Sequence, residues 1–287
     1  MAELLKGAPV AAALTEELSA RCGALKAAGI VPTLAIVRMG EHPEDISYEN
    51  AAVKRCEKIG IQAKRFPVAE DVDKTAFLAV IDHINANPAI HGCLMFRPLP
   101  DRELEEAACA RLNPAKDVDG MTGASLTGVF AGTKAGFPPC TAQACLEILD
   151  YYHIPIAGKR AVVVGRSLVV GRPVSMLLLG RNATVTLCHT KTANLAAECR
   201  RAEILIAAAG KAGVISGDCL TPGQVVLDVG IHPVPGGGLR GDVDFEAAEK
   251  TVKAVTPVPG GVGAVTTAVL AKHVLQAAEK ISRLGLA

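Results

Sequence analysis

Short apolar runs alternate with segments of helical periodicity along most of this 287-residue chain, and this alternation is the strongest constraint on its fold. Buried strands are predicted at 33–40, 61–68 and 91–96. Helices are predicted at 9–28, 44–59 and 73–86. Strands separated by helices of this length form a parallel sheet with helices on both faces. We therefore expect an open α/β sheet that binds ligands at the carboxyl ends of its strands.

The second half of the chain repeats this alternation. A helix is expected at 142–151, followed by a β-branched strand at 161–164 that leads directly into glycine. Further strands are expected at 183–188, 203–210 and 224–231, and a last helix reaches about residue 280. Between the halves, residues 113–139 contain five glycines, three prolines and few periodic apolar positions. Irregular chain of that length is typical of a functional loop or a domain junction, and we predict both.

Composition excludes several classes of function. The chain has 30 Lys and Arg against 29 Asp and Glu, a formal charge of +1, which leaves no broad basic surface for nucleic acid or a membrane. Aromatic residues make up only 3%, too few for a base-stacking platform. Nine cysteines without a C-x-x-C pair indicate reduced thiols, and the histidines lack metal-ligand spacing. We predict a cytoplasmic protein that acts on a small molecule without a metal.

Residues 165–180, GRSLVVGRPVSMLLLG, predict a phosphate-binding loop ahead of a helix. Gly165, Ser167 and Gly171 would lie at the helix amino end, where unpaired N–H groups and a partial positive charge attract anions. Ser167 stands at the second glycine position of G-x-G-x-x-G, so a plain tight turn is the competing interpretation. The strand expected at 183–188 favours a nucleotide, because a mononucleotide-binding βαβ unit needs it there.

The end of that strand indicates which dinucleotide would bind. NAD sites usually place Asp or Glu there for the ribose 2′-hydroxyl, whereas NADP sites offer cations and hydroxyls to the 2′-phosphate. Here residues 188–192 are Cys-His-Thr-Lys-Thr, and Arg166 lies in the preceding loop. NADP is therefore favoured, with NAD as the alternative. Lys191 and Arg166 would face the phosphate, unless they are ordinary solvated charges.

Several motifs in fixed order carry a family resemblance: KDVDG (116–120), PCT (139–141), VVGRSLVVGRP (163–173), CHTKT (188–192), VLDVGI (226–231), GDVDF (241–245) and TPVPGGVG (256–263). With them the chain resembles the methylenetetrahydrofolate dehydrogenase/methenyltetrahydrofolate cyclohydrolase family over nearly its whole length. The resemblance implies a homodimer whose protomers hold folate between two domains. An α/β domain at 1–140 would be completed by the helix at 266–287, and a Rossmann-like NADP domain would occupy 141–265.

The resemblance also implies the site residues. The implied cofactor-binding residues are Gly165, Arg166, Ser167, Gly171, Thr190, Ile231 and Thr266. The implied substrate-binding residues are Tyr48, Met95, Phe96, Arg97, Asp119, Pro259 and Gly263. Tyr48 and Asp119 are the implied catalytic residues. Asp119 matches the family aspartate that binds the pterin ring, whose 2-amino-4-oxo edge can donate two parallel hydrogen bonds to a carboxylate. A turn acid is the plainer alternative for Asp119.

The chain departs from the family at three positions, two of which are linked. Members with both activities carry Tyr-x-x-x-Lys on one helix, so that both side chains share a face. Here Tyr48 is present, but the residue four positions later is Ala52. Lys54 lies about 600° around the helix from Tyr48 and points elsewhere. Phe96 stands where the family strand end usually has glutamine, and Ala264 replaces a proline in the last glycine-rich loop.

These losses predict an unequal effect on the two activities. Cyclohydrolysis needs a positioned acid or base such as a lysine, whereas hydride transfer needs only close positioning. We expect an NADP-dependent dehydrogenase with weak or lost cyclohydrolase. One alternative keeps both activities, with Arg97 or Lys54 as substitute base. The other is a folate- or nucleotide-binding protein without turnover. Cys140 is expected to be a packing residue rather than a nucleophile, and His189 a polar lining of the cofactor pocket.

Overall fold

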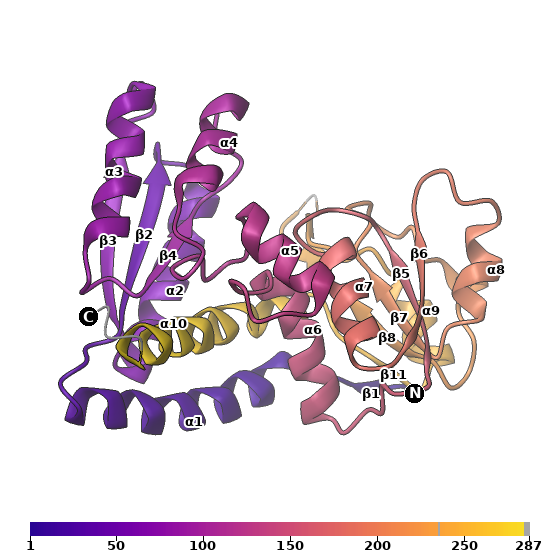
Figure 1. Ribbon diagram of the computed structural model, residues 1–287. Coiled ribbons are helices and arrows are strands. Elements are labelled where there is room, and N and C mark those ends of the chain that lie inside the picture. Colours follow the sequence, from indigo (N-terminus) through magenta and orange to yellow (C-terminus); the bar gives the residue numbers. More distant parts are fainter. Residues whose placement is uncertain (235, 284–287) are drawn as a thin grey trace. The chain divides into compact units, whose positions relative to one another are not determined.

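The computed structural model describes residues 1–234 and 236–283, which form two compact units. Unit 1 comprises Met1–Ala12 and Thr141–Thr266. Unit 2 comprises Ala13–Cys140 and the segment that begins at Thr267. Three helices cross the boundaries between these segments and so belong to both units: α1 (Gly7–Ala27), α6 (Cys140–Tyr151) and α10 (Thr266–Arg283). The predicted parallel α/β architecture is confirmed in each unit (Figure 1).

Unit 2 is built around a three-stranded parallel sheet with the strand order β3-β2-β4. Its strands are β2 (Thr33–Met39), β3 (Gln62–Val68) and β4 (Gly92–Met95). Its own helices are α2 (Pro43–Ile59), α3 (Lys74–Ala86), α4 (Arg102–Arg111) and α5 (Gly123–Ala131). Successive side chains of β2 point to opposite faces of the sheet, so alternate residues enter different cores. Ala35, Val37 and Met39 pack in one core cluster with residues of α3 and α4.

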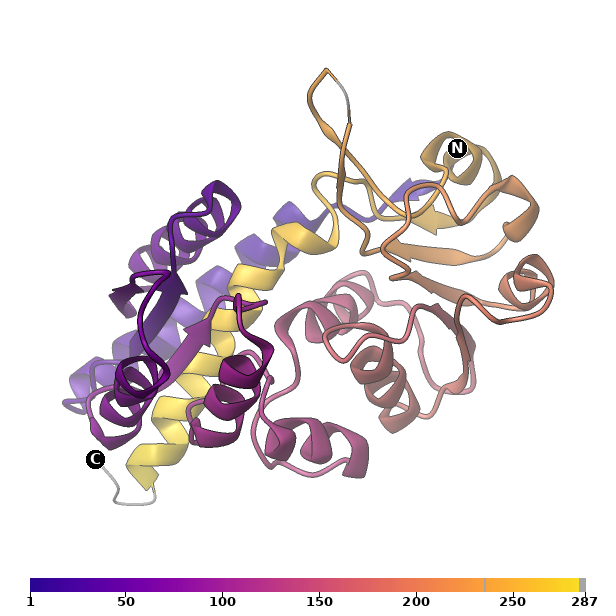
Figure 2. The same ribbon diagram turned by 90° about the horizontal axis from the view of Figure 1, so that it is seen from above.

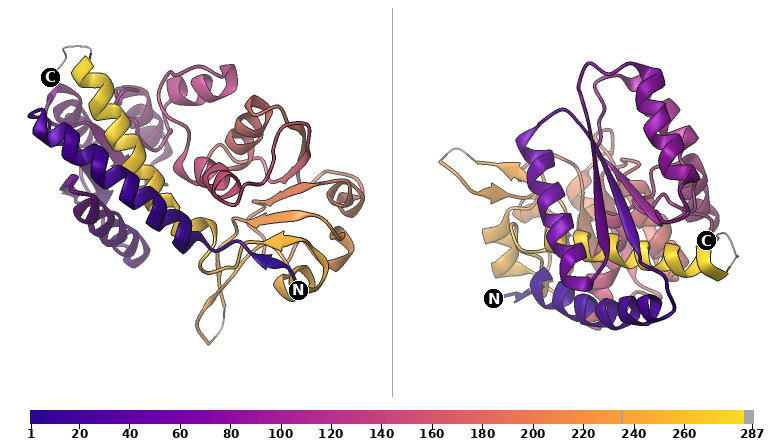
Figure 3. Two further views of the ribbon diagram at one scale, coloured as in Figure 1. Left: turned by 90° about the horizontal axis from the view of Figure 1, so that it is seen from below. Right: turned by 90° about the vertical axis from the view of Figure 1, so that its left-hand side faces the viewer.

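The opposite face of this sheet is covered by α2 and α10 (Figures 1 and 3). Gly92 of β4 lies so close to α10 that a Cβ there would be 3.2 Å from the Val274 side chain. Arg21 of α1 binds Glu279 of α10 at 3.1 Å, and the two helices run side by side (Figure 3). Helix α2 begins with Pro43 and ends at Gly60, whose φ of 97° is left-handed. These restraints fix the helix that carries Tyr48.

Unit 1 contains a six-stranded parallel sheet with the order β1-β11-β8-β7-β5-β6. Its strands are β1 (Glu3–Leu4), β5 (Arg160–Val164), β6 (Thr184–Cys188), β7 (Ile204–Ala207), β8 (Val225–Asp228) and β11 (Ala254–Val255). Its own helical segments are α7 (Gly171–Gly180), α8 (Leu195–Arg200), η1 (Gly217–Cys219), α9 (Phe245–Thr251) and η2 (Val262–Ala264). The strand order reverses at β5, which is followed in the chain by β6 on one side and β7 on the other. Ligands of open α/β sheets bind at such a switch point.

A short antiparallel hairpin, β9 (His232–Pro233) and β10 (Leu239–Arg240), projects from the unit 1 sheet (Figure 2). One face of that sheet packs Val162, Leu205 and Val226 into a cluster with residues of α8, η1 and α9. The buried side chains Val174 and Leu178 of α7 belong to the other face, next to β5 and β6. Helices therefore cover both faces, as the alternation predicted.

Two expectations need correction. The first twelve residues belong to unit 1, not to the domain predicted at 1–140, because β1 pairs in parallel with β11. The segment 113–139 is also not irregular throughout, since it contains α5. That helix begins after Thr122, whose side chain accepts a hydrogen bond from the Ser125 N–H, and it buries Ser125 and Gly128. A helix that buries small and polar residues has no apolar periodicity for a sequence reading to detect.

Candidate functional site

Tyr48 and Ala52 lie one turn apart on α2, where the resemblance expects tyrosine and lysine. Tyr48 is half-buried, and Ala52 is 1% exposed among the buried residues of the helix. Phe96 follows β4, and its ring meets the Tyr48 ring edge-on with centroids 5.9 Å apart and planes at 83°. Such pairs contribute about 0.5–1.5 kcal/mol beyond the buried area. An apolar contact therefore supports the tyrosine, and a methyl group occupies the lysine position.

A buried carboxylate next to Tyr48 is neutralised by two arginines. Glu49 is 4% exposed, and its Oε2 accepts a hydrogen bond from Arg38 Nε at 2.7 Å. Its Oε1 lies 2.5 Å from Arg65 Nε. Sequence reasoning missed this cluster, because the three side chains come from α2, β2 and β3. Since both carboxylate oxygens are engaged, Glu49 is a structural anion rather than a candidate acid or base.

The two cations considered as substitute bases have other surroundings. Arg97 Nη1 lies 3.7 Å from Glu105 Oε1, and Glu105 Oε2 accepts a hydrogen bond from the Leu99 N–H at 2.8 Å. Guanidinium also keeps its proton at any physiological pH. Lys54 is exposed on α2, whereas Ala52 is buried. Neither side chain occupies the position of the expected lysine.

The first half of the KDVDG motif is structural. Lys116 is 5% exposed, and its ammonium donates to the carbonyls of Ile84, Asn85 and Asn87 at 2.7–3.0 Å. These carbonyls belong to the end of α3, where a cation is favoured by the helix dipole. Asp117 is fully buried and accepts hydrogen bonds from three groups of the following turn. The motif therefore fixes the turn that presents Asp119.

Asp119 is half-buried beside the start of α6. Its Oδ1 accepts a hydrogen bond from the Cys140 N–H at 3.3 Å. Burial raises the pKa of the Asp119 carboxyl, and the Cys140 contacts and the positive charge of Arg97 oppose that rise. Gly120 follows with a left-handed φ of 66°, and a Cβ there would lie 2.5 Å from the Pro139 nitrogen. The glycine is therefore required where the aspartate turns back toward α6.

The thiol of Cys140 donates to the Val118 carbonyl at 3.3 Å. Burial, and after it the charge of Asp119, raises the pKa of this thiol well above its usual value. A protonated, buried thiol is a poor nucleophile, which fits the packing role expected for Cys140. The sequence reading gave no role to its neighbour His273, whose Nδ1 lies 2.9 Å from the Val118 carbonyl oxygen. His273 also stacks on Phe137 at 5.1 Å.

Met95 belongs to the core rather than to an accessible surface. It is 2% exposed and packs in the same cluster as Phe77 and Ile81 of α3. The alternation of β4 turns Met95 toward α3 and α4, whereas Leu94 faces the other side of the sheet. We therefore leave Met95 out of the proposed substrate site.

In unit 1, the loop between β5 and α7 has no room for side chains at its two glycines. A Cβ on Gly165, whose φ is 122°, would lie 1.9 Å from the Ala208 carbonyl oxygen. A Cβ on Gly171 would lie 1.9 Å from the Gly165 carbonyl oxygen. Ser167 Oγ accepts hydrogen bonds from the N–H groups of Val170 at 3.0 Å and Gly171 at 3.4 Å. The loop is thus folded tightly over the start of α7, with Arg166 and Ser167 exposed.

The end of β6 lies beside this loop, because the Gly165 N–H donates to the Cys188 carbonyl at 2.9 Å. Thr190 and Lys191 follow and are both exposed. His189 Nδ1 accepts a hydrogen bond from the Lys191 N–H at 3.1 Å, which shapes the turn. Hydroxyl and ammonium groups are therefore offered here without a carboxylate in residues 188–192.

A cavity of about 290 Å³ in unit 1 brings together three predicted residues from two separate segments. Ile231, Pro259 and Gly263 line it, and a Cβ on Gly263 would lie 3.5 Å from Ile231 Cδ1. Thr266 is buried next to this loop and donates its hydroxyl to the Gly263 carbonyl at 3.1 Å. Ala264 also lines the cavity, in the short 3-10 turn before α10.

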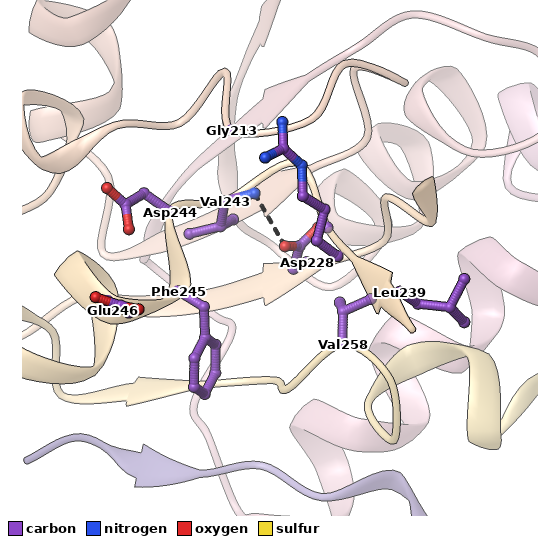
Figure 4. Close-up of a pocket in the computed structure, with 10 residues that line it drawn as sticks. Gly213, Asp228, Leu239, Val243, Asp244, Phe245, Glu246 and Val258 are labelled. Atoms are coloured by element: carbon purple, nitrogen blue, oxygen red, sulfur yellow. Dashed lines mark hydrogen bonds between the residues drawn. The ribbon is translucent and has the colours of Figure 1, made fainter. Parts of the chain in front are cut away.

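A second cavity of unit 1, about 500 Å³ in volume, is lined by none of the predicted site residues (Figure 4). Asp228, at the end of β8, lines both cavities. It accepts hydrogen bonds from the N–H groups of Gly230, Asp242 and Val243 at 2.9–3.0 Å. Burial nevertheless raises the pKa of Asp228 to about 6. Sequence reasoning missed this carboxylate, although it lies within the VLDVGI motif.

The residues of unit 1 fit a dinucleotide phosphorylated on its ribose. The glycine pair lets the loop fold tightly at the amino end of α7, where a pyrophosphate is favoured, and the exposed Arg166, Thr190 and Lys191 suit a 2′-phosphate. Among residues 1–234 and 236–283, no cluster of His, Cys, Asp and Glu is suited to a metal ion. Within the same residues, no helix is long and apolar enough to span a bilayer.

Two family models match the sequence. The catalytic domain of tetrahydrofolate dehydrogenase/cyclohydrolase matches residues 5–119, and the NAD(P)-binding domain of the same family matches residues 139–282. Among curated proteins, the bifunctional protein FolD of Carboxydothermus hydrogenoformans is 53% identical over 99% of this chain and 100% of its own.

Two solved structures have nearly the same fold. The bifunctional FolD methylenetetrahydrofolate dehydrogenase/cyclohydrolase of Campylobacter jejuni has a TM-score of 0.94 at 35% identity, covering 98% of this chain and 99% of its own. The Trypanosoma brucei enzyme, which was solved with NADP cofactor and an inhibitor, has a TM-score of 0.92 at 32% identity with the same coverage.

Proposed function

Because the chain belongs to the tetrahydrofolate dehydrogenase/cyclohydrolase family, we propose that it oxidises 5,10-methylenetetrahydrofolate to 5,10-methenyltetrahydrofolate with NADP and has weak or no cyclohydrolase activity. The observation that carries this proposal is the contrast between the cofactor loop after β5 and the surroundings of Tyr48. The cofactor loops keep glycines that nothing larger could replace, whereas the lysine position holds the buried Ala52 and Phe96 packs on Tyr48.

Substrate recognition would rest on Asp119 and Tyr48. The Asp119 carboxylate, which the preceding turn holds in place, accepts hydrogen bonds from the amino edge of the pterin ring. The Tyr48 ring, supported edge-on by Phe96, offers a flat surface of fixed orientation. On the cofactor side, Arg166, Thr190 and Lys191 bind the 2′-phosphate, and Ile231 lines the cavity of unit 1. Bound NADP supplies a hydride acceptor at C4 of its nicotinamide.

Hydride transfer requires little acid–base catalysis by the protein, whereas cyclohydrolysis requires a group that transfers protons. Water must add to the methenyl carbon and the ring must open, with protons moved by a positioned group. Arg97 pairs with Glu105, Lys54 is exposed and both oxygens of Glu49 bind arginines. None of these side chains therefore supplies the proton transfer that the missing lysine would provide. The remaining activity of this centre would be the oxidation.

A second candidate function is the bifunctional one, and the names of the relatives favour it. The similar proteins of Carboxydothermus hydrogenoformans and Campylobacter jejuni are both described as bifunctional. In that case another group would have to move the protons during hydrolysis. A folate- or nucleotide-binding protein without turnover is the third candidate, and the intact cofactor loop argues against it. The proposed protein is a cytoplasmic homodimer, as the family resemblance implies.

Two absorbance assays on the purified protein distinguish these candidates. The first follows NADPH formation from methylenetetrahydrofolate and NADP, and the second follows loss of methenyltetrahydrofolate without any nucleotide. We expect NADPH formation together with methenyl hydrolysis at the uncatalysed rate. Hydrolysis clearly above that rate would establish the bifunctional candidate. No activity in either assay would favour the binding protein without turnover. Replacing NADP by NAD in the first assay should lower kcat/KM, since the 2′-phosphate contacts are then lost.

A further inference from the structure

Apart from the two N–H groups that it donates to Asp228, the GDVDF motif at 241–245 has no role in the site described above, yet its first aspartate is fully buried. We propose that Asp242 is a positioning residue that holds together the two loops after β7 and β8, and thereby sets the shape of the nicotinamide end of the cofactor site. This inference rests on the proposed NADP function. Asp242 itself lines neither of the two cavities of unit 1 described above, so its effect would be indirect.

The Asp242 carboxylate bridges the two loops with separate oxygens. Oδ2 accepts hydrogen bonds from the N–H groups of Ala209 at 2.6 Å and Gly210 at 3.0 Å, directly after β7. Oδ1 lies 2.7 Å from His232 Nε2, directly after the β8 loop. The Asp242 N–H in turn donates to Asp228 Oδ1 at 2.9 Å. A single side chain therefore ties the loop after β7 to the segment after β8, at the carboxyl ends of two neighbouring strands.

Each of these loops reaches a residue of the cofactor site. Ala208 precedes the Asp242-bound segment, and its carbonyl oxygen is the atom that a Cβ on Gly165 would meet at 1.9 Å. His232 follows Ile231, which lines the 290 Å³ cavity. Gly230 comes so close that a Cβ there would lie 2.3 Å from Asp242 Oδ1. Movement of Asp242 would therefore displace the wall at Ile231, whereas the Gly165 loop is also held from β6, because its N–H donates to the Cys188 carbonyl at 2.9 Å.

The chemistry of the contacts explains why a carboxylate stands at this position. Both of its oxygens must accept: one faces two backbone N–H groups, and the other faces an imidazole nitrogen. An asparagine offers one oxygen and one NH2 group, so one of the two sides loses its acceptor. Hydrogen bonds to a charged acceptor are the stronger kind, and a buried donor left without a partner is costly.

The test compares the binding of two ligands to the whole protein by titration calorimetry. NADP would contact both ends of the site, whereas 2′,5′-ADP would contact only the phosphate-binding end at Arg166, Thr190 and Lys191. We expect D242N to weaken NADP binding at least tenfold and H232A about threefold to tenfold, with 2′,5′-ADP binding changed less than twofold. Non-additivity in the double variant D242N/H232A would show that the two residues act together.

Asp244 provides the matched control, because it undergoes the same substitution two residues away. It is exposed, and its Oδ1 accepts a hydrogen bond from the Ala247 N–H at the start of α9. D244N should leave the affinity for both ligands unchanged. Hydrogen exchange of the unliganded variants adds a readout that needs neither ligand nor activity. Exchange should rise at 208–210 and 229–231 in D242N and H232A, but not in D244N.

Equal loss of NADP and 2′,5′-ADP binding in D242N and H232A would overturn the proposal, because it would indicate a general loss of structure. Wild-type NADP affinity in both variants, with unchanged exchange of the two loops, would overturn it as well. If D242N fails to fold, H232A alone decides. A wild-type protein that binds neither ligand would contradict the proposed function instead, and the exchange of the two loops would still decide the role of Asp242.

Discussion

Replacing His273 by asparagine should remove a large part of the acid sensitivity of this protein. The imidazole is 3% exposed on α10, and its Nδ1 lies 2.9 Å from the Val118 carbonyl oxygen. Burial lowers the pKa of His273 from 6.5 to about 4, and the neighbouring charges of Lys272 and Lys280 act in the same direction. Folding therefore requires the neutral ring, whereas the unfolded chain takes up a proton below pH 6.5. The stability that His273 supplies above pH 6.5 is lost as the pH falls toward 4.

The magnitude follows from the two pKa values. One pKa unit corresponds to about 1.4 kcal/mol, so the full shift is worth about 3 kcal/mol below pH 4. At pH 5 only part of it is lost, about 2 kcal/mol relative to pH 8. In H273N the asparagine amide can still donate to the carbonyl but does not titrate. The free energy of unfolding of wild type minus that of H273N should therefore fall by about 2 kcal/mol between pH 8 and pH 5.

Urea unfolding of both proteins at pH 8, 7, 6 and 5 measures this difference, because all other titrating groups are common to them. His153, an exposed residue at the end of α6 with a left-handed φ of 53°, supplies the control. Asparagine tolerates that backbone, so H153N should follow wild type at every pH. A difference between wild type and H273N that is constant within about 0.5 kcal/mol, or that grows toward low pH, would refute the reasoning.

Two further predictions concern the cofactor loop and the KDVDG turn. G171A should lower the affinity for NADP, measured by calorimetric titration, at least tenfold, because its Cβ would lie 1.9 Å from the Gly165 carbonyl oxygen. G180A in the same helix has open space around its Cβ and should bind NADP normally. K116M leaves three carbonyls at the end of α3 without their ammonium donor, so it should lower the free energy of unfolding, measured in urea, by about 3 kcal/mol. K211M, at an exposed position, is the control and should change that free energy by less than about 0.5 kcal/mol.

Local signals in the sequence were sufficient for the main strands and for the tight loop after β5. Apolar runs at β2, β5 and β8 are continuous because both faces of each sheet are covered, and Gly165 follows β5 as the phosphate-loop pattern predicts. The two-residue strand β1 could not be predicted, because it exists only through its pairing with β11, 251 residues later. Such a strand has no periodicity of its own.

The side-chain clusters around the predicted site could not be predicted from the sequence either, because their members are far apart along the chain. His273 and Val118 are 155 residues apart, and Asp242 and Ala209 are 33 apart. Nothing in the local sequence pattern indicates that His273 is a buried neutral imidazole or that Asp242 anchors a neighbouring loop. The absence of the lysine at position 52 could be read directly, because the resemblance fixes the frame on both sides of Tyr48. That the Phe96 ring packs beside Tyr48, nearly at right angles to it, could be learned only from the structure.

We propose that Ala52 and Phe96 separate the two family activities. This proposal is tested most directly by the rate of methenyltetrahydrofolate hydrolysis, measured without nucleotide, for the wild type and for the double variant A52K/F96Q. The account predicts that the wild type does not exceed the uncatalysed rate, while it reduces NADP with methylenetetrahydrofolate, and that the double variant gains hydrolysis at least tenfold above the uncatalysed rate. Rapid hydrolysis by the wild type, unchanged in the double variant, would contradict the account.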